Sequence, residues 1–249
     1  IAAALAGTGV LLSDPKLSRV NLLAAGKGLL RIDGERLTAV NRLPGIAVFS
    51  LPDRLPVLPD RVLAGAKIAP VAVPESVLRE VESIASGEPV IDVKPFRPLK
   101  VGVVTTEIMA GRTRDRFEQS LHAKIGWYGG EVIGFADVPD EADAVAGAIE
   151  RFVADGAGLI LTGGGNTIDP LDAALLALPR IGAEIVKFGA PAHPGSMFWL
   201  AYRGDVPIFN LASCSMYSQA TSADLVLPWI MAGERVTLDD VALVALRLA

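Results

Sequence analysis

The chain has 249 residues, of which 51% are hydrophobic and 20% are charged, and its formal net charge at pH 7 is −5. This composition predicts a globular protein with a large core and excludes an intrinsically disordered chain. The negative net charge offers no chain-wide attraction to nucleic acid or anionic lipid, and the apolar runs are shorter than the roughly 20 residues of a membrane-spanning helix. We therefore expect neither a nucleic acid nor a membrane as a partner.

The chain contains one cysteine, Cys214, and two histidines, His122 and His193. One cysteine excludes an internal disulfide, and these few side chains exclude thiolate or multi-histidine metal sites. We therefore expect a reducing, cytoplasmic setting. The chain opens on Ile1-Ala2-Ala3-Ala4 without a methionine or a basic segment. We interpret this start as the end of a helix whose beginning is missing, not as a signal peptide.

Residues 1–94 predict a small β-rich domain in which short apolar runs alternate with turn residues. Asp33-Gly34 is typical of a hairpin turn. Apolar positions at helical spacing predict a helix over Pro74–Ser86, which Gly87 would end. The candidate strands are Gly28-Leu29-Leu30, Ile46-Ala47-Val48-Phe49 and Lys67-Ile68-Ala69.

The segment Lys94-Pro95-Phe96-Arg97-Pro98 separates this part from an α/β domain predicted over residues 98–249, because its prolines prohibit helix and disfavour a central strand. Beyond it, strands alternate with helices, which predicts a three-layer αβα fold with a mostly parallel sheet. The expected strands are Lys100–Thr106, Glu131–Ala136, Gly158–Thr162, Glu184–Phe188 and Val206–Leu211. The expected helices are 113–128, Glu141–Ala154, Leu171–Leu178 and Ser215–Met231.

A glycine-rich loop follows one of the buried strands. Ligands of open parallel sheets bind beyond the carboxyl ends of the strands, and glycines let an anion approach the main-chain amides closely. The candidate phosphate-binding residues of this loop are Gly163, Gly164, Gly165 and Asn166. The alternative is that the glycines only form a tight turn. The loop lacks both the dinucleotide-binding and the Walker patterns.

Two carboxylates, Asp169 and Asp172, come directly after this loop. They are candidates to hold Mg²⁺ or to orient a phosphate-linked group. We therefore predict Asp169 and Asp172 as the metal-binding and catalytic residues. The alternative is that Asp169 caps the following helix, with Pro170 at its first position.

Polar residues after other strands complete the predicted site. Thr105 and Thr106 end the first strand, and their hydroxyls could hold a phosphate or a pterin, unless a threonine here only caps a turn. Lys187 lies inside an apolar strand, where a cation needs an anionic partner, unless it is an edge-strand lysine that blocks association between sheets. Ser213 and Ser215 could bind an anion or cap the last helix.

Three arginines, Arg112, Arg114 and Arg116, stand at the entrance of the helix predicted over 113–128. Such a cluster could attract a phosphate. It is more often a solvated helix face.

The order of these motifs resembles the molybdopterin-binding domain family, which includes molybdopterin adenylyltransferases, molybdopterin molybdenumtransferases, gephyrin and the N-terminal domain of CinA-like proteins. The resemblance covers residues 98–233. Its motifs are Val103-Val104-Thr105-Thr106, Leu161-Thr162-Gly163-Gly164-Gly165 with Asp169 and Asp172, Val186-Lys187-Phe188-Gly189 with Pro194-Gly195, and the run from Val206 to Cys214. The preceding part resembles the region found before this domain in a bacterial subgroup, where the module stands alone or is fused to a nucleotidyltransferase.

This resemblance implies that the chain binds molybdopterin, or its nucleotide form, in molybdenum-cofactor biosynthesis. As an enzyme it would be a Mg²⁺-dependent adenylyltransferase or molybdenumtransferase. The resemblance also implies a homo-oligomer, with a nucleotidyltransferase or a molybdoenzyme-maturation protein as partner.

The motifs depart from the family pattern where nucleotide or molybdate chemistry takes place. Glu107-Ile108-Met109 replaces the usual Asp-Glu pair, and Leu171 stands where enzymatic members place an aspartate. Ala212-Ser213-Cys214-Ser215 replaces a Pro-Gly-Asn-Pro loop. A non-catalytic cofactor-binding or sensing module therefore stays an alternative, as does a nucleotide pyrophosphatase like the CinA-type relatives.

Overall fold

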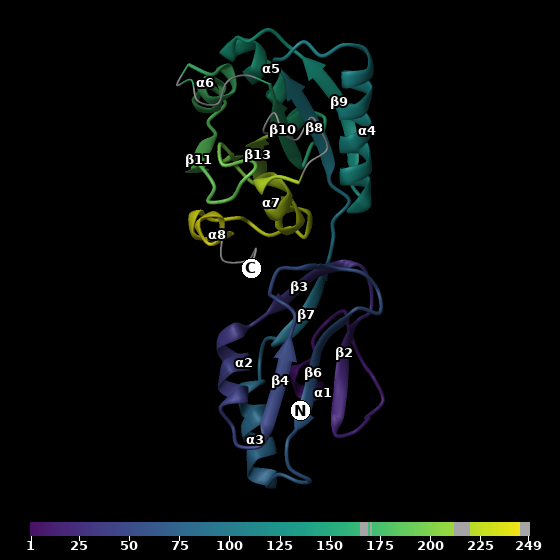
Figure 1. Ribbon diagram of the computed structural model, residues 1–249. Helices are drawn as coiled ribbons and strands as arrows, with labels where there is room; N and C mark the ends of the chain where they lie inside the picture. Colours follow the sequence, from purple (N-terminus) through teal and green to yellow (C-terminus); the bar gives the residue numbers. More distant parts are fainter. Residues whose placement is uncertain (165–168, 170, 212–219, 245–249) are drawn as a thin grey trace. The chain divides into compact units, whose positions relative to one another are not determined.

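The computed structural model describes residues 1–164, 169, 171–211 and 220–244. The chain divides into two compact units, Ile1–Phe96 and Arg97–Ala249, here called the N-terminal and the C-terminal unit (Figure 1). Within the described ranges, no helix is both long and apolar enough to cross a membrane.

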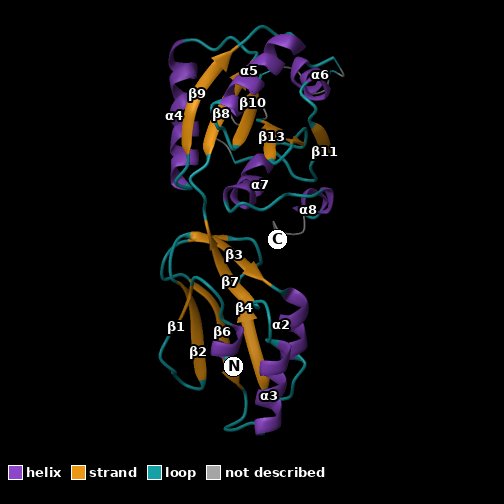
Figure 2. Cartoon of the chain, turned by 180° about the vertical axis from the view of Figure 1, so that it is seen from behind, coloured by secondary structure: helices purple, strands orange, loops and turns teal. Residues whose placement is uncertain are grey.

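The N-terminal unit contains two antiparallel sheets and short helices around one apolar core (Figure 2). The four-stranded sheet has the order β1 (Val10–Leu12), β2 (Arg19–Ala24), β6 (Val62–Ile68) and β4 (Ile46–Ser50). The three-stranded sheet has the order β5 (Pro56–Val57), β3 (Gly28–Ile32) and β7 (Ile91–Pro95). The helices are α1 (Ala2–Leu5), α2 (Gly34–Asn41) and α3 (Glu75–Ile84). Pro95 ends an edge strand, where a missing N–H interrupts no ladder.

The hairpin predicted at Asp33-Gly34 is wrong, because this pair begins a helix. Asp33 is the N-cap of α2, and its carboxylate accepts a hydrogen bond from the main-chain N–H of Arg36 at 3.0 Å. Leu37 and Val40 then bury one face of α2. An Asp-Gly pair suits either a turn or a helix start, and the apolar spacing that follows decides between them.

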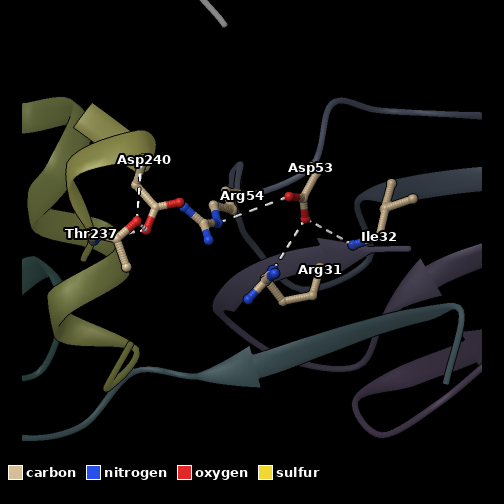
Figure 3. A network of polar contacts seen from close by, with 6 residues as sticks. All are labelled: Arg31, Ile32, Asp53, Arg54, Thr237 and Asp240. Atoms are coloured by element: carbon tan, nitrogen blue, oxygen red, sulfur yellow. Dashed lines mark hydrogen bonds and ion pairs between the residues drawn. The ribbon is translucent and has the colours of Figure 1, made fainter. Parts of the chain in front are cut away.

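Asp53 connects strand β3 to the loop that precedes β5 (Figure 3). Its carboxylate accepts from the main-chain N–H of Ile32 at 2.8 Å and from Nε of Arg31 at 3.1 Å. Nε of Arg54 lies 3.9 Å from the second carboxylate oxygen. Asp53 therefore has a structural role within the N-terminal unit, because its carboxylate is paired with two arginines and a main-chain N–H.

The C-terminal unit contains a six-stranded sheet of order β11-β12-β13-β10-β8-β9. The strands are β8 (Lys100–Thr105), β9 (Glu131–Asp137), β10 (Leu159–Gly163), β11 (Glu184–Phe188), β12 (Trp199–Arg203) and β13 (Val206–Asn210). β8, β9, β10 and β13 pair in parallel, whereas β12 pairs antiparallel with both of its neighbours. The predicted mostly parallel sheet is therefore confirmed.

Helices cover both faces of this sheet, which confirms the three-layer αβα fold (Figures 1 and 2). The helices are α4 (Gly111–Trp127), α5 (Ala142–Ala154), α6 (Ala173–Arg180), α7 (Ser222–Met231) and α8 (Leu238–Ala242). Phe152 of α5 fills the space over Gly102 and Gly134, while Phe117 of α4 packs on Phe135. Successive strand residues point to opposite faces, so α5 and α4 lie on opposite sides.

One expectation about this unit needs correction, and two of its elements were not predicted. Strand β12 was not predicted, although Gly204-Asp205 between two apolar runs is a two-residue hairpin signal. The last long helix begins at Ser222, not Ser215, because Thr221 and Asp224 form a capping box there. The short helix α8 was also not predicted.

Candidate functional site

The carboxyl ends of three neighbouring strands meet in one row of residues at one edge of the sheet. Asp137 of β9 pairs with Thr105 of β8, and Thr105 pairs with Gly163 of β10, each being the last residue of its strand. β13 ends at the same edge, where Asn210 pairs with Thr162. Ligands of open parallel sheets bind at this edge. The structure thus brings the predicted glycine loop and the predicted threonine segment to adjacent strands.

Gly164 follows this row and packs directly on the segment that leaves β8. Its φ is +82°, and a Cβ atom there would lie 2.6 Å from the main-chain nitrogen of Glu107 and 3.1 Å from Oγ1 of Thr106. The main-chain N–H of Thr106 donates to the carbonyl of Gly163 at 3.1 Å. Glycine is required because it tolerates both this φ and so close an approach. The two loops therefore lie main chain to main chain, with no side chain of Gly164 between them.

The two threonines occupy different environments. Thr105 is fully buried, and its hydroxyl donates to Oδ1 of Asp137 at 2.5 Å. Thr106 is half-buried and is the neighbour of Gly164. The hydroxyl of Thr105 is thus bonded within the protein, and Thr106 is the threonine that is partly exposed at the carboxyl end of the sheet.

Arg114 of α4 joins Thr105 at the carboxylate of Asp137. Its Nη1 donates to the same Oδ1 at 2.5 Å, its Nε donates to Glu118, and its guanidinium lies 5.2 Å from the ring centre of Phe135. Burial opposes ionisation of Asp137, but the hydrogen bonds from Thr105 and Arg114 and the Arg114 charge outweigh it and lower the pKa of this carboxyl. Of the three arginines predicted as a cluster, Arg114 therefore belongs to an ion-pair network.

Sequence reasoning missed Asp137 as part of this edge. It directly follows the strand predicted over Glu131–Ala136, and a charged residue after an apolar run is the available signal. The pairing with Arg114 joins residues 23 positions apart and has no signal in local spacing.

Asp172 is the N-cap of α6 and is 5% exposed. Its Oδ1 accepts from the main-chain N–H groups of Ala174 at 3.0 Å and Leu175 at 3.2 Å. Burial raises the pKa of Asp172, and the charges of Asp140 and Asp169 add to this increase. The helix cap is therefore Asp172, and the alternative that placed the cap at Asp169 is wrong.

Asp169 is exposed and organises the turn before α6. Its Oδ1 accepts from the main-chain N–H of Leu171 at 2.8 Å, and its carbonyl accepts from the N–H of Asp172 at 3.0 Å. Asp169 and Asp172 thus have different surroundings, although the sequence proposed one shared role. Across the described ranges, no group of three His, Cys, Asp or Glu side chains could hold a metal ion.

Lys187 lies on β11, the edge strand of the sheet, and is half-buried. β12 and β13 separate it from β10, which places it about 14 Å from the glycine loop at the usual strand spacing. The structure therefore does not bring Lys187 next to Gly163 and Gly164. Its position agrees with the alternative of an edge-strand lysine.

The loop between β11 and β12 closes on the start of α7. Gly195 has a φ of +102°, and a Cβ atom there would lie 2.4 Å from Oγ of Ser222. The Ser222 hydroxyl donates to the carbonyl of Gly195, and its main-chain N–H donates to the carbonyl of Pro194 at 3.1 Å. This contact explains why the predicted Pro194-Gly195 motif needs glycine. Gly165, Asn166, Ser213 and Ser215, which were predicted as ligand contacts, lie outside the described residues.

The side chain of Asn210, at the end of β13 beside β10, makes two hydrogen bonds to the main chain. Its Oδ1 accepts from the main-chain N–H of Trp199 at 2.6 Å, and its Nδ2 donates to the carbonyl of Met197 at 3.0 Å. Asn210 therefore holds the start of β12 in place at this edge.

These features define an α/β domain whose candidate ligand site lies at the carboxyl ends of parallel strands. Residues 100–232, more than half of the chain, match the family described as "Probable molybdopterin binding domain". The chain belongs to this family, which confirms the resemblance drawn from the motifs.

Two molybdenum cofactor biosynthesis proteins are among the solved structures that resemble the chain. One is the crystal structure of molybdenum cofactor biosynthesis protein B, at 17% identity, with 55% of this chain and 92% of that chain covered and a TM-score of 0.41. The other is a candidate molybdenum cofactor biosynthesis protein from Corynebacterium diphtheriae, at 18% identity, with 53% and 93% covered and a TM-score of 0.36. No curated protein sequence gives a significant match.

Proposed function

We propose that the C-terminal unit binds molybdopterin, or its nucleotide form, with the terminal phosphate on the main chain of the glycine loop. The chain carries a molybdopterin-binding domain. The observation that supports this position of the ligand is the contact of Gly164 with Thr106 and Glu107, because it brings the main chain of two loops together at the carboxyl ends of the strands. A chain with a net charge of −5 must hold an anion by such local features.

The N-terminus of α6 is a weaker candidate for the phosphate. Its N–H groups at Ala174 and Leu175 already bond the carboxylate of Asp172. An anion bound there would meet this negative side chain. The phosphate is therefore assigned to the glycine loop, with Gly165, Asn166 and the hydroxyl of Thr106 as further donors, and with Ser213 and Ser215 contributing from the segment after β13.

Lys187 takes part only if the ligand extends along the sheet edge. At about 14 Å from the glycine loop it is out of reach of a phosphate bound there. The nucleotide form of molybdopterin is longer and could reach it. This geometry makes Lys187 a residue that distinguishes the two forms.

Mg²⁺ enters the proposal only together with a ligand. Mg²⁺ is usually held by one or two carboxylates plus substrate phosphates. The exposed carboxylate of Asp169 fits this use, whereas Asp172 is buried as a cap. A bound Mg²⁺ would neutralise phosphate charge during adenylyl or molybdate transfer.

A non-catalytic cofactor-binding module is the second candidate function. It is favoured by Asp172, whose carboxylate is used to cap α6, and by Leu171 at the position where enzymatic members carry an aspartate. Incubation with molybdopterin and Mg²⁺-ATP, followed for pyrophosphate release, separates the two. Turnover that is lost in Asp169→Asn with Asp172→Asn supports the enzyme. Hydrolysis of a nucleotide without molybdopterin would support a pyrophosphatase.

Isothermal titration with molybdopterin under anaerobic conditions tests binding. We expect Gly164→Asp to weaken binding by about 10- to 100-fold, the range of one or two lost charge-assisted hydrogen bonds. Gly156→Asp is the matched control, since Gly156 also has a positive φ, +85°, but nothing within 4 Å of its Cβ position. Absence of binding by the unmodified protein, or equal affinity in both variants, would refute the proposal.

We also propose that the chain forms a homo-oligomer, as its resemblance to the family implies. Sedimentation equilibrium of the full chain tests it, and a mass equal to 26.0 kDa at all concentrations would contradict it.

A further inference from the structure

The row Asp137–Thr105–Gly163 connects an exposed carboxylate to the glycine loop. Asp137 is 57% exposed on its side chain, while Thr105 between it and Gly163 is fully buried. Thr105 and Gly163 are partners in the pairing of β8 with β10, and the main-chain N–H of Thr106 donates to the carbonyl of Gly163 at 3.1 Å. A displacement of Thr105 would therefore be transmitted to the end of β10.

Asp137 holds Thr105 from the side opposite the glycine loop. Its Oδ1 accepts from Oγ1 of Thr105 and from Nη1 of Arg114, both at 2.5 Å. The main-chain N–H of Val138 donates to the carbonyl of Thr105 at 2.9 Å. Side chain and main chain of Thr105 are thus both held by the end of β9.

Arg114 is itself fixed by three contacts. It bonds Asp137 and Glu118 and lies over the ring of Phe135, and its side chain is 17% exposed. A guanidinium held in this way presents a defined donor to Asp137. The pair therefore supports the threonine segment, on which Gly164 rests, from helix α4.

We propose that Asp137 and Arg114 are positioning residues that hold the Thr105–Glu107 segment in the conformation that receives the phosphate next to Gly164. This inference rests on the proposed function. Neither residue touches the ligand, and both act through Thr105.

The sign of the effect of Asp137→Asn separates positioning from simple electrostatics. A carboxylate at the rim repels a phosphate, so its neutralisation would strengthen binding if only charge mattered. If Asp137 positions Thr105, the same substitution weakens binding, because an amide is a poorer acceptor for the two donors at Oδ1. We expect the affinity for molybdopterin to fall about tenfold, which corresponds to about 1.4 kcal/mol.

Three further variants complete the titration experiment. Asp115→Asn makes the same charge change on the exposed face of α4 and should leave the affinity unchanged. Arg114→Ala should weaken binding as Asp137→Asn does, and Arg114→Lys should restore part of it, because lysine keeps the charge but not the fork of donors.

Amide hydrogen exchange in the absence of ligand gives a second readout. Peptides that cover Thr105–Glu107 should exchange faster in Asp137→Asn than in the unmodified protein or Asp115→Asn. Equal or tighter binding by Asp137→Asn, or unchanged exchange at this segment, overturns the positioning role and leaves the proposed function intact. Absence of molybdopterin binding by the unmodified protein refutes the proposed function itself, and this inference fails with it.

Discussion

Replacing Gly164 by alanine tests the close approach of the two loops at the ligand edge. Alanine at a φ of +82° carries backbone strain of about 1–2 kcal/mol. Its Cβ would also lie 2.6 Å from the nitrogen of Glu107, so 3.4 − 2.6 = 0.8 Å of movement is needed for an ordinary contact. Overpacking of this kind costs about 1–3 kcal/mol. We expect Gly164→Ala to lower the free energy of unfolding by about 2–5 kcal/mol.

Gly156→Ala separates the two contributions. Gly156 has nearly the same φ, +85°, but nothing within 4 Å of its Cβ position, so it carries the strain without the overlap. We expect it to lower the free energy of unfolding by only about 1–2 kcal/mol.

Tryptophan fluorescence during urea unfolding of the full chain measures both variants. The chain has three tryptophans, Trp127, Trp199 and Trp229, and all three lie in the C-terminal unit. The fluorescence change therefore reports on this unit. Equal losses of stability in Gly164→Ala and Gly156→Ala would show that the two loops do not meet as described.

Three other substitutions test separate parts of the C-terminal unit. Burial raises the pKa of Asp172 in the folded protein above its value in the unfolded chain. The protonated carboxyl therefore stabilises the fold at pH values below the unfolded pKa. This stabilisation is lost as the pH rises through the folded pKa. The variant Asp172→Asn keeps the helix cap but does not titrate. Urea unfolding should show that the unmodified protein loses stability relative to this variant over the same pH interval. A stability difference that does not change with pH would contradict the assigned pKa shift. Gly195→Ala places a Cβ 2.4 Å from Oγ of Ser222, and its loss of stability in the fluorescence assay should exceed that of Gly156→Ala; an equal loss would argue against the contact. Lys187→Ala should weaken titration of the nucleotide form and not of molybdopterin, and an equal effect on both would remove Lys187 from the extended site.

The sequence by itself determined the αβα fold class, the family and, except for β12 and α8, the alternation of strands and helices along residues 98–249. These properties depend on local patterns: apolar runs such as that of β10, helical spacing such as that of α5, and the succession of motifs along residues 98–233. The errors were also local. Asp33-Gly34 suits both a turn and a helix cap, and the Gly204-Asp205 turn signal before β13 was not used.

Only the tertiary structure decided which of the predicted site residues lie together. Strand order places β10 beside β8 and three strands away from β11, so it joins Gly163 to Thr105 and separates both from Lys187. The tertiary structure also shows that Asp172 is a buried helix cap and that Asp137 and Arg114 lie next to the threonine segment. Such neighbours are set by the pairing of strands and the packing of helices across long stretches of chain, and local sequence spacing carries no record of them.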